Sequence, residues 1–178
     1  QAATKSAPLR VKKTNDGIIV HRWMLDVEPA PFYKKVVGFD GNCDRLQHYE
    51  VRYPSNALIK AVFTPAGTGG SEGKLHDDVF IMDSYNFMTP VTESKTRYYW
   101  FQLRNIRPDD SALSQLMTDD VQQAFEEDRN VLNEVQKGMT NKTSPHIDLP
   151  IDAGQLRFRR QLQAMINEEE QVDKQMAQ

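Results

Sequence analysis

The sequence predicts an α+β fold, in which a curled antiparallel sheet packs around one long helix and a final amphipathic helix follows. Stretches rich in β-branched and aromatic residues, separated by turn signals, fill the first two-thirds of the chain. The apolar period then changes to 3.6 residues near residue 112, and a second helical stretch lies near the end. Strands followed by helices, rather than alternating with them, are typical of α+β proteins.

The first hairpin is predicted by the turn sequence Asn15-Asp16-Gly17. It joins the strand-like stretches PLRVKKT (8–14) and IIVHRWMLD (18–26). The following EPAPFY (28–33) is expected to be an extended proline segment, and residues 39–42 form a turn.

A second hairpin is predicted around Pro54, between LQHYEVRY (46–53) and NALIKAVFT (56–64). The glycine-rich PAGTGGSEGK (65–74) is expected to be a flexible loop. It lacks the GK[ST] ending of a phosphate-binding loop and is not followed by a helical pattern, which argues against a nucleotide site.

The two longest predicted strands are DVFIMDSYNFMTP (78–90) and TRYYWFQLRNI (96–106), joined by a turn at residues 92–94. The aromatic residues of the second strand alternate across the sheet, so about half of them face inward whatever the function.

Two helices complete the prediction. The run Pro108-Asp109-Asp110-Ser111 is typical of a helix N-cap, and the helical pattern extends from Ala112 to about Lys137, with Gly138 as the expected stop. A second amphipathic helix is predicted from Gln155 to Gln171.

Composition excludes several classes of protein. The 178 residues suit one domain, and a net charge of −3 with pI about 5.8 gives no electrostatic footprint for nucleic acid or an anionic membrane. No apolar run is long enough for a bilayer, and no signal peptide is visible. Cys43 is the only cysteine, so this chain alone can carry neither an intrachain disulfide nor an iron–sulfur cluster. A cytoplasmic location is expected.

One acidic residue of the long predicted helix occupies an unusual position. Val121, Phe125, Leu132 and Val135 fall on one stripe, and Asp128 lies between them, within roughly 20–60° of each at about 100° per residue. A carboxylate that faces a core costs several kcal/mol unless it is paired or binds a metal. Asp128 is therefore expected to face a cavity between the sheet and the helix.

Two interpretations of Asp128 remain open from the residues alone. It forms a structural ion pair with an arginine such as Arg104 or Arg107, or it is a metal ligand or general base. The four histidines occur singly, without the HxH, HxxH or HxxxxH spacing that places two imidazoles on one metal; they are His21, His48, His76 and His146. A metal site complete within this chain is therefore not expected.

Several motifs resemble a known family in the same order along the chain. The main ones are MTPVTESKTRYYWFQLRN (88–105), FEEDRNVLNEVQ (125–136) and IDAGQLRFRRQL (151–162), with HRWMLD, EPAPFY and CDRLQ before them. Together they are similar to the C-terminal catalytic domain of Rieske non-haem iron oxygenases. The nearest type is the vanillate O-demethylase oxygenase group, to which dicamba monooxygenase is related. The resemblance implies a helix-grip, START-like version of the α+β fold.

The resemblance implies a mononuclear Fe(II) held by two histidines and one carboxylate, and the carboxylate corresponds to Asp128. It implies that residues 1–178 are a C-terminal catalytic fragment. The two partner histidines are expected upstream of residue 1. A Rieske [2Fe–2S] cluster is expected in the full-length enzyme but not on this chain, because the C-x-H and C-x-x-H motifs are absent.

Three substrate-binding positions are suggested by the same resemblance. Asn86 matches a position that holds a polar substrate contact in dicamba monooxygenase, although an outward polar strand residue is the alternative. Ile59 matches a second pocket position, which is polar in dicamba monooxygenase. Arg97 stands where relatives often have histidine and could meet an acidic substrate, with a solvated arginine near a turn as the alternative.

The function implied is hydroxylation or O-demethylation of an aromatic substrate, carboxylated or an aryl ether, with O₂. A reductase component would donate the electrons, and the full-length protein would be a homotrimer or hexamer. Two other functions remain: a metal-free helix-grip module that binds an apolar or aromatic small molecule, and an interaction domain. No nucleic-acid or membrane partner is expected.

Overall fold

The computed structural model describes residues 7–141 and 147–176, which form two compact units. Of the described residues, 7–106 and 150–176 belong to the first unit, and 107–141 and 147–149 belong to the second. No helix in the described part of the chain is long and apolar enough to span a membrane.

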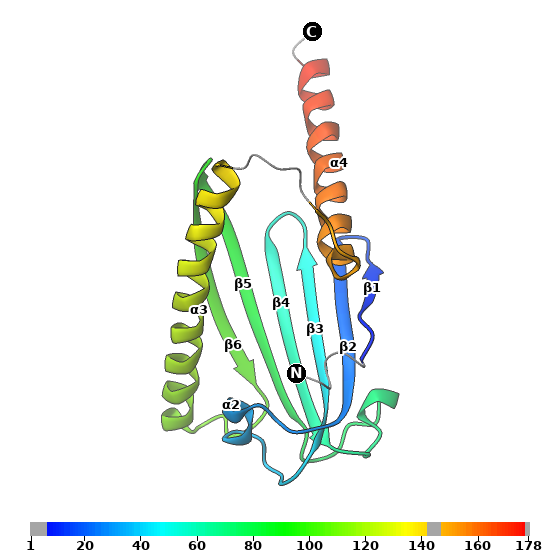
Figure 1. The fold of residues 1–178 in the computed structure, drawn as a ribbon, viewed down its shortest axis with the longest axis vertical. Coiled ribbons are helices and arrows are strands. Elements are labelled where there is room, and N and C mark those ends of the chain that lie inside the picture. Colours follow the sequence, from blue (N-terminus) through cyan, green and yellow to red (C-terminus); the bar gives the residue numbers. More distant parts are fainter. Residues whose placement is uncertain (1–6, 142–146, 177–178) are drawn as a thin grey trace. The chain divides into compact units, whose positions relative to one another are not determined.

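The first unit is built on a six-stranded antiparallel sheet in which the strands follow one another in sequence order (Figure 1). The strands are β1 (Arg10–Lys13), β2 (Gly17–Val27), β3 (Cys43–Arg52), β4 (Asn56–Pro65), β5 (Phe80–Thr92) and β6 (Lys95–Arg104). This order confirms the antiparallel sheet and all three predicted hairpins. Each hairpin pairs neighbouring strands, so the topology needs no crossover connection.

The helical elements of the first unit are short except for the last. They are α2 (Pro31–Lys34), the 3₁₀ turns η1 (Gly70–Glu72) and η2 (Pro150–Asp152), and α4 (Ala153–Met176). The prediction of an extended segment over residues 28–33 was wrong at its end, where α2 begins. Pro31 has the fixed φ angle that suits the first position of a helix, and Pro has no N–H to leave unpaired there.

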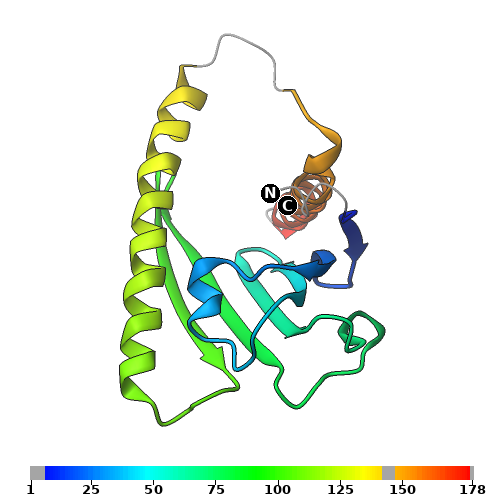
Figure 2. The same ribbon diagram turned by 60° about the horizontal axis from the view of Figure 1, so that its bottom comes forward.

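The α4 helix lies on one side of the sheet, and Figure 2 shows it almost end-on. Its Gly154 packs so closely on Val20 that an added Cβ would lie 2.5 Å from Val20 Cγ2. Phe158 stacks on Tyr53 with 5.4 Å between ring centroids, and Lys13 Nζ donates to Gln161 Oε1 at 2.8 Å. We call this side of the sheet the α4 face.

The pairing register divides the strand residues between the α4 face and the opposite side, which we call the histidine face. On the α4 face the strands contribute residues that pair across the sheet, among them Val20, Tyr49, Ile59, Ser84, Asn86 and Trp100. On the histidine face they contribute His21, His48, Glu50, Lys60, Asp83 and Phe101.

The core of the first unit is concentrated at the end of the sheet where β4 finishes and β5 starts. Phe63 and Phe80 are both fully buried, and the Tyr33 ring of α2 packs on Phe63 at 4.2 Å between centroids. The guanidinium of Arg45 lies 5.2 Å and 5.1 Å from the centroids of Tyr33 and Phe63, a cation–π arrangement that covers this cluster.

The CDRLQ motif contributes a structural clamp at the same end. The buried Asp44 carboxylate accepts hydrogen bonds from the backbone N–H of Asp26 at 3.0 Å and of Gly67 at 3.0 Å. Asp26 has a positive φ of 52°, which is unusual for a residue with a side chain, and Asn42 also donates to its carboxylate. Asp44 therefore fixes the end of β2 and the loop after β4.

Cys43 is buried, and its thiol donates to the carbonyl of Val27 at 3.2 Å. Burial raises the pKa of Cys43 to about 11, so the thiolate that reacts or binds metals is not formed near neutral pH.

The second unit contains α3 (Ser111–Thr140), a helix of 30 residues. Asp110 is the N-cap and accepts a hydrogen bond from the backbone N–H of Leu113 at 2.8 Å, which confirms the predicted start. The predicted stop at Gly138 was wrong, because the helix continues to Thr140. A single glycine costs a helix only about 1 kcal/mol, and at Gly138 the helix continues through it.

Replacing Gly138 with alanine is therefore expected to stabilise α3. An added Cβ would meet nothing within 4 Å, and alanine loses less backbone freedom than glycine in a helix. The free energy of unfolding should rise by up to about 1 kcal/mol, measured by urea titration followed by circular dichroism. A loss of stability instead would mean that the helix ends at Gly138 in solution.

Candidate functional site

The α4 face carries a hydrogen-bonded polar group on its last two strands, formed by Asn86 of β5 and Tyr98 of β6. The Tyr98 hydroxyl donates to Asn86 Oδ1 at 2.6 Å, and Asn86 Nδ2 donates to the Ser84 carbonyl at 3.0 Å. Asn86 is only 2% exposed, so the alternative of an outward, solvated side chain is wrong. These bonds fix the orientation of the carboxamide, because its oxygen must face the hydroxyl and its nitrogen the carbonyl.

Ile59 lies on the same face as Asn86, one strand away. Ile59 pairs with Ser84 and Asn86 pairs with Ala57, so Ile59 and Asn86 are diagonal neighbours on β4 and β5. Tyr49 is directly opposite Ile59 on β3, and Trp100 is directly opposite Asn86 on β6. An apolar, aromatic surface with one oriented polar group suits a planar apolar ligand that carries a polar substituent.

Arg97 is not part of this group. It pairs with Thr89 near the start of β6, and it has the opposite strand parity from Tyr98, so its side chain extends from the histidine face. It is exposed, and its Nη1 donates to the Tyr99 hydroxyl at 3.5 Å. This position favours the interpretation of Arg97 as a solvated arginine.

Asp128 lies near the middle of α3, in the second unit. Its side chain is exposed, as are Leu132 at 64% and Val135 at 49%. The expectation that Asp128 faces an apolar interior is therefore not met within this unit, since the apolar stripe around it is itself open. Helical periodicity shows which residues share a stripe, but it does not show which part of a long stripe is buried.

The alternative role for Asp128 was an ion pair with an arginine. Within the described part of α3, the Asp128 carboxylate makes neither a hydrogen bond nor an ion pair. Arg107, one of the two candidate partners, forms an ion pair with Asp110. The Asp128 carboxylate is thus unengaged by its own helix and is sterically available to a cation.

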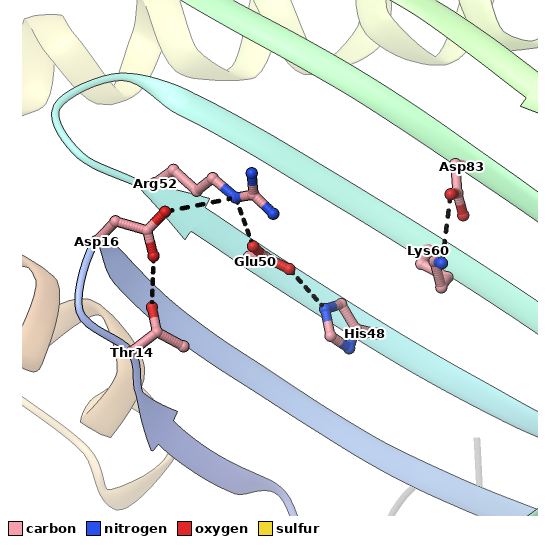
Figure 3. Close-up of polar contacts among 7 residues, drawn as sticks. All are labelled: Thr14, Asp16, His48, Glu50, Arg52, Lys60 and Asp83. Atoms are coloured by element: carbon pink, nitrogen blue, oxygen red, sulfur yellow. Dashed lines mark hydrogen bonds and ion pairs between the residues drawn. The ribbon is translucent and has the colours of Figure 1, made fainter. Parts of the chain in front are cut away.

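The histidine face carries a polar network where the β1–β2 turn lies beside the end of β3 (Figure 3). Glu50 accepts from Arg52 Nε at 2.7 Å and lies 3.2 Å from His48 Nε2. Although burial would raise the pKa of Glu50, the hydrogen bonds from Arg52 and His48 outweigh it and lower that pKa. Figure 3 also shows Asp16 beside Arg52, and Lys60 paired with Asp83 at 3.3 Å on the neighbouring strands.

His21 adds a titratable group to this face, with its ring 6.4 Å from the ring of His48. Burial, followed by the positive charges of His48, Arg10 and Lys12, lowers the pKa of His21 below its ordinary 6.5. As the pH falls below about 6.5, the unfolded chain takes up this proton before the folded protein does, so stability is lost with falling pH.

The free energy of unfolding is expected to be smaller at pH 5.5 than at pH 7.5. In His21→Gln, whose side chain cannot take up the proton, the difference in unfolding free energy between the two pH values should be smaller. Urea titrations at both pH values measure these free energies. His76→Gln, at a loop histidine, is the matched control and should keep the pH dependence of the unaltered chain. An equal pH dependence in His21→Gln and the unaltered chain would remove His21 as its cause.

Neither the Asn86–Tyr98 pair nor the Asp44 clamp was singled out by reasoning from the sequence. Alternation within β6 indicates only that half of its aromatic residues share a face. The pair depends on the register between β5 and β6, which sequence alone does not supply. No group of three or more histidine, cysteine, aspartate or glutamate side chains that could hold a metal ion occurs in the part of the chain that the structure describes.

The fold is similar to that of dicamba monooxygenase. The structure of that enzyme bound to 3,6-dichlorosalicylic acid matches 94% of this chain with a TM-score of 0.81 at 18% identity, and the match covers 49% of that chain. A structure of dicamba monooxygenase with non-haem iron and dicamba matches with a TM-score of 0.66 at 19% identity, covering 92% of this chain and 50% of that one.

Residues 1–168 match the family described as the vanillate O-demethylase oxygenase C-terminal domain, and the chain belongs to that family. A vanillate O-demethylase oxygenase subunit of a Pseudomonas strain is 26% identical over 99% of this chain and 55% of its own length. A putative toluene-4-sulfonate monooxygenase system iron-sulfur subunit of Comamonas testosteroni is 31% identical over 77% of this chain and 40% of its own length. The chain therefore spans about half the length of the curated relatives it matches.

Proposed function

We propose that this chain is the catalytic-domain portion of a Rieske-type oxygenase that hydroxylates or O-demethylates an aromatic substrate. The observation that carries this proposal is the family match over residues 1–168, since the relatives named above are oxygenase subunits. The α4 face would supply contacts for such a substrate, because it has aromatic side chains beside an oriented carboxamide.

Iron does not fit the described residues of this chain by themselves. Asp128 offers one anionic oxygen, and three protein ligands are needed for the two-histidine, one-carboxylate site of non-haem iron oxygenases. We propose that Asp128 is the carboxylate ligand and that two histidines from outside residues 1–178 complete the set. The Rieske [2Fe–2S] cluster would likewise belong to another part of the full-length protein, because Cys43 alone cannot ligate a cluster.

The role proposed for this chain in catalysis is to bind and orient the substrate. Tyr49, Ile59 and Trp100 would contact the faces and edges of an aromatic ring, which is bound by apolar burial and ring contacts. Asn86, held by Tyr98, would mark the polar end of the site. Because the carboxamide is fixed before any ligand arrives, little side-chain freedom is lost when the substrate binds.

The partners follow from the same proposal. The substrate is an aromatic compound, carboxylated or an aryl ether, and O₂ is the second substrate. A reductase component would supply electrons, consistent with a relative described as a subunit of a monooxygenase system. The full-length protein would assemble as a trimer or hexamer.

A metal-free binding module is the second candidate, and the buried Asn86 carboxamide held by Tyr98 on the α4 face is the observation that would serve it. Such a protein would use the same α4 face to hold an aromatic molecule without transforming it. The two candidates differ in one measurable property, which is whether iron binds when the missing histidines are supplied.

The deciding experiment uses an oxygenase in which this chain is joined to a segment that carries two histidine ligands and a Rieske domain. Bound iron is measured by elemental analysis, and formaldehyde is measured after incubation with 4-methoxybenzoate, O₂ and a reductase. We expect more bound iron than the [2Fe–2S] cluster accounts for. We also expect release of formaldehyde or formation of a ring-hydroxylated product. Aromatic binding with neither additional iron nor product would support the metal-free module instead.

A further inference from the structure

The Ser84 hydroxyl is a buried polar group whose hydrogen-bonding capacity is unused. Ser84 is 3% exposed, and no residue in the described parts of the chain forms a hydrogen bond with its Oγ. Buried hydroxyls in native proteins almost always have a partner, which is another protein group, an ordered water or a ligand.

The position of Ser84 places its hydroxyl in the proposed substrate site. On the α4 face it pairs with Ile59 of β4 and with Gln102 of β6, and Asn86 is the next residue of β5 on the same face. Its diagonal neighbours on β4 are Ala57 and Ala61, whose side chains end at Cβ. The surroundings of the hydroxyl on β4 are therefore short or apolar, and none of these β4 side chains can accept its proton.

Asn86 differs from Ser84 because its side chain already uses its hydrogen-bonding groups. Its Oδ1 accepts from Tyr98 and its Nδ2 donates to the backbone carbonyl of Ser84, so its amide is already engaged. The Ser84 hydroxyl retains one donor and its acceptor lone pairs. In this part of the site, Ser84 is therefore better able than Asn86 to donate a new hydrogen bond to a ligand.

We propose that Ser84 is a specificity-determining residue whose hydroxyl donates a hydrogen bond to an oxygen of the aromatic substrate. The oxygen is a carboxylate or an aryl ether oxygen, both of which accept hydrogen bonds. This inference rests on the proposed function, because it takes the α4 face as the substrate site.

The proposal predicts opposite effects of one substitution on stability and on binding. Removing an unsatisfied buried hydroxyl relieves its desolvation cost, so Ser84→Ala should raise the Tm of the ligand-free chain, by about 2–4 °C. The same change removes a hydrogen bond to the ligand and should weaken binding by roughly 3- to 10-fold. A purely structural serine would not weaken ligand binding while raising the Tm.

Thr64→Val is the matched control. Thr64 is also buried, and its Oγ1 also lacks a partner in the described structure, but it has the opposite strand parity from Ile59 and lies on the histidine face. Valine has nearly the shape of threonine without the hydroxyl. Thr64→Val should therefore raise the Tm as Ser84→Ala does and leave aromatic binding unchanged.

Three probes distinguish a hydrogen bond to the carboxylate from one to the ether oxygen. 4-Methoxybenzoate has both groups, 4-methylbenzoate has only the carboxylate, and 4-methylanisole has only the ether. Binding of each probe to the 178-residue chain is measured by calorimetry and by tryptophan fluorescence. If Ser84 contacts the carboxylate, Ser84→Ala weakens the binding of the two benzoates and leaves the binding of 4-methylanisole unchanged. If Ser84 contacts the ether, Ser84→Ala weakens the binding of 4-methoxybenzoate and 4-methylanisole and leaves the binding of 4-methylbenzoate unchanged.

Two results would overturn the inference and separate it from the proposed function. If the unaltered chain binds the probes and Ser84→Ala binds all of them equally well, Ser84 has no role in recognition and the substrate-site proposal survives. If the unaltered chain binds none of the probes, both the substrate site and the role of Ser84 are wrong. A lower Tm for Ser84→Ala would show a structural hydrogen bond and would also overturn the inference.

Discussion

Replacing Asp128 with asparagine is expected to abolish iron binding and turnover in the complete oxygenase while the fold remains intact. Asparagine has nearly the same volume and shape as aspartate, but its amide supplies no anionic oxygen to the metal. Product formation should fall by more than roughly 100-fold, since even changes to residues behind the ligands cost up to about that factor.

Stability should hardly change in Asp128→Asn, and this separates the ligand from an ion-pair partner. The Asp128 side chain is exposed and unpaired within the described part of α3, so the change in unfolding free energy should stay within about 0.5 kcal/mol. Had Asp128 paired with a buried arginine, its replacement would cost a few kcal/mol and leave any iron in place.

Glu127→Gln is the control for this experiment. Glu127 is the adjacent residue, is also exposed, and only accepts a hydrogen bond from Gln123 at 3.2 Å, so iron and turnover should be retained. Iron content, product yield and Tm are measured on both variants. A folded Asp128→Asn enzyme with full iron and normal turnover would end the assignment of Asp128 as a ligand.

Gly17→Ala is expected to destabilise the sheet more than any other substitution considered. An added Cβ would lie 2.0 Å from the carbonyl oxygen of Val51 and 3.0 Å from its carbonyl carbon. These are backbone atoms of β3, and they cannot move away without separating the end of β3 from the start of β2, where Gly17 pairs with Arg52. The expected loss is about 3 kcal/mol or more, at the upper end for overpacking.

Gly38→Ala is the comparison, because an added Cβ there meets nothing within 4 Å. Thermal and urea unfolding of both variants measure the difference, and a loss of 3 kcal/mol lowers the Tm of a domain of this size by roughly 6–12 °C. If Gly17→Ala is no less stable than Gly38→Ala, the described pairing of the start of β2 with the end of β3 is incorrect.

The sequence by itself determined the elements that depend on local chemistry. Asn15-Asp16-Gly17 specifies the tight hairpin between β1 and β2, and Asp110 specifies the start of α3, because in both cases the residues that decide the conformation are adjacent in the chain. The alternation of apolar residues likewise identified the strands. Their order is a meander, the arrangement that short turns between consecutive strands permit.

Local signals failed where two preferences competed. Gly138 favours a helix end, but its cost is small beside the hydrogen bonds that continue the helix for two further residues, to Thr140. Pro31 was taken as part of an extended segment, although proline is also well suited to the first turn of a helix.

Only the tertiary structure decided which polar residues lie together. Asn86 and Tyr98 form a hydrogen bond because the β5–β6 register places them diagonally on the α4 face. Arg97 is adjacent to Tyr98 in sequence, and its side chain therefore lies on the histidine face. The unused hydroxyl of Ser84 is likewise invisible in sequence, since a strand serine gives no sign of whether its partner is present. Register and burial are set by contacts between distant segments, and a pattern of neighbours along the chain does not contain them.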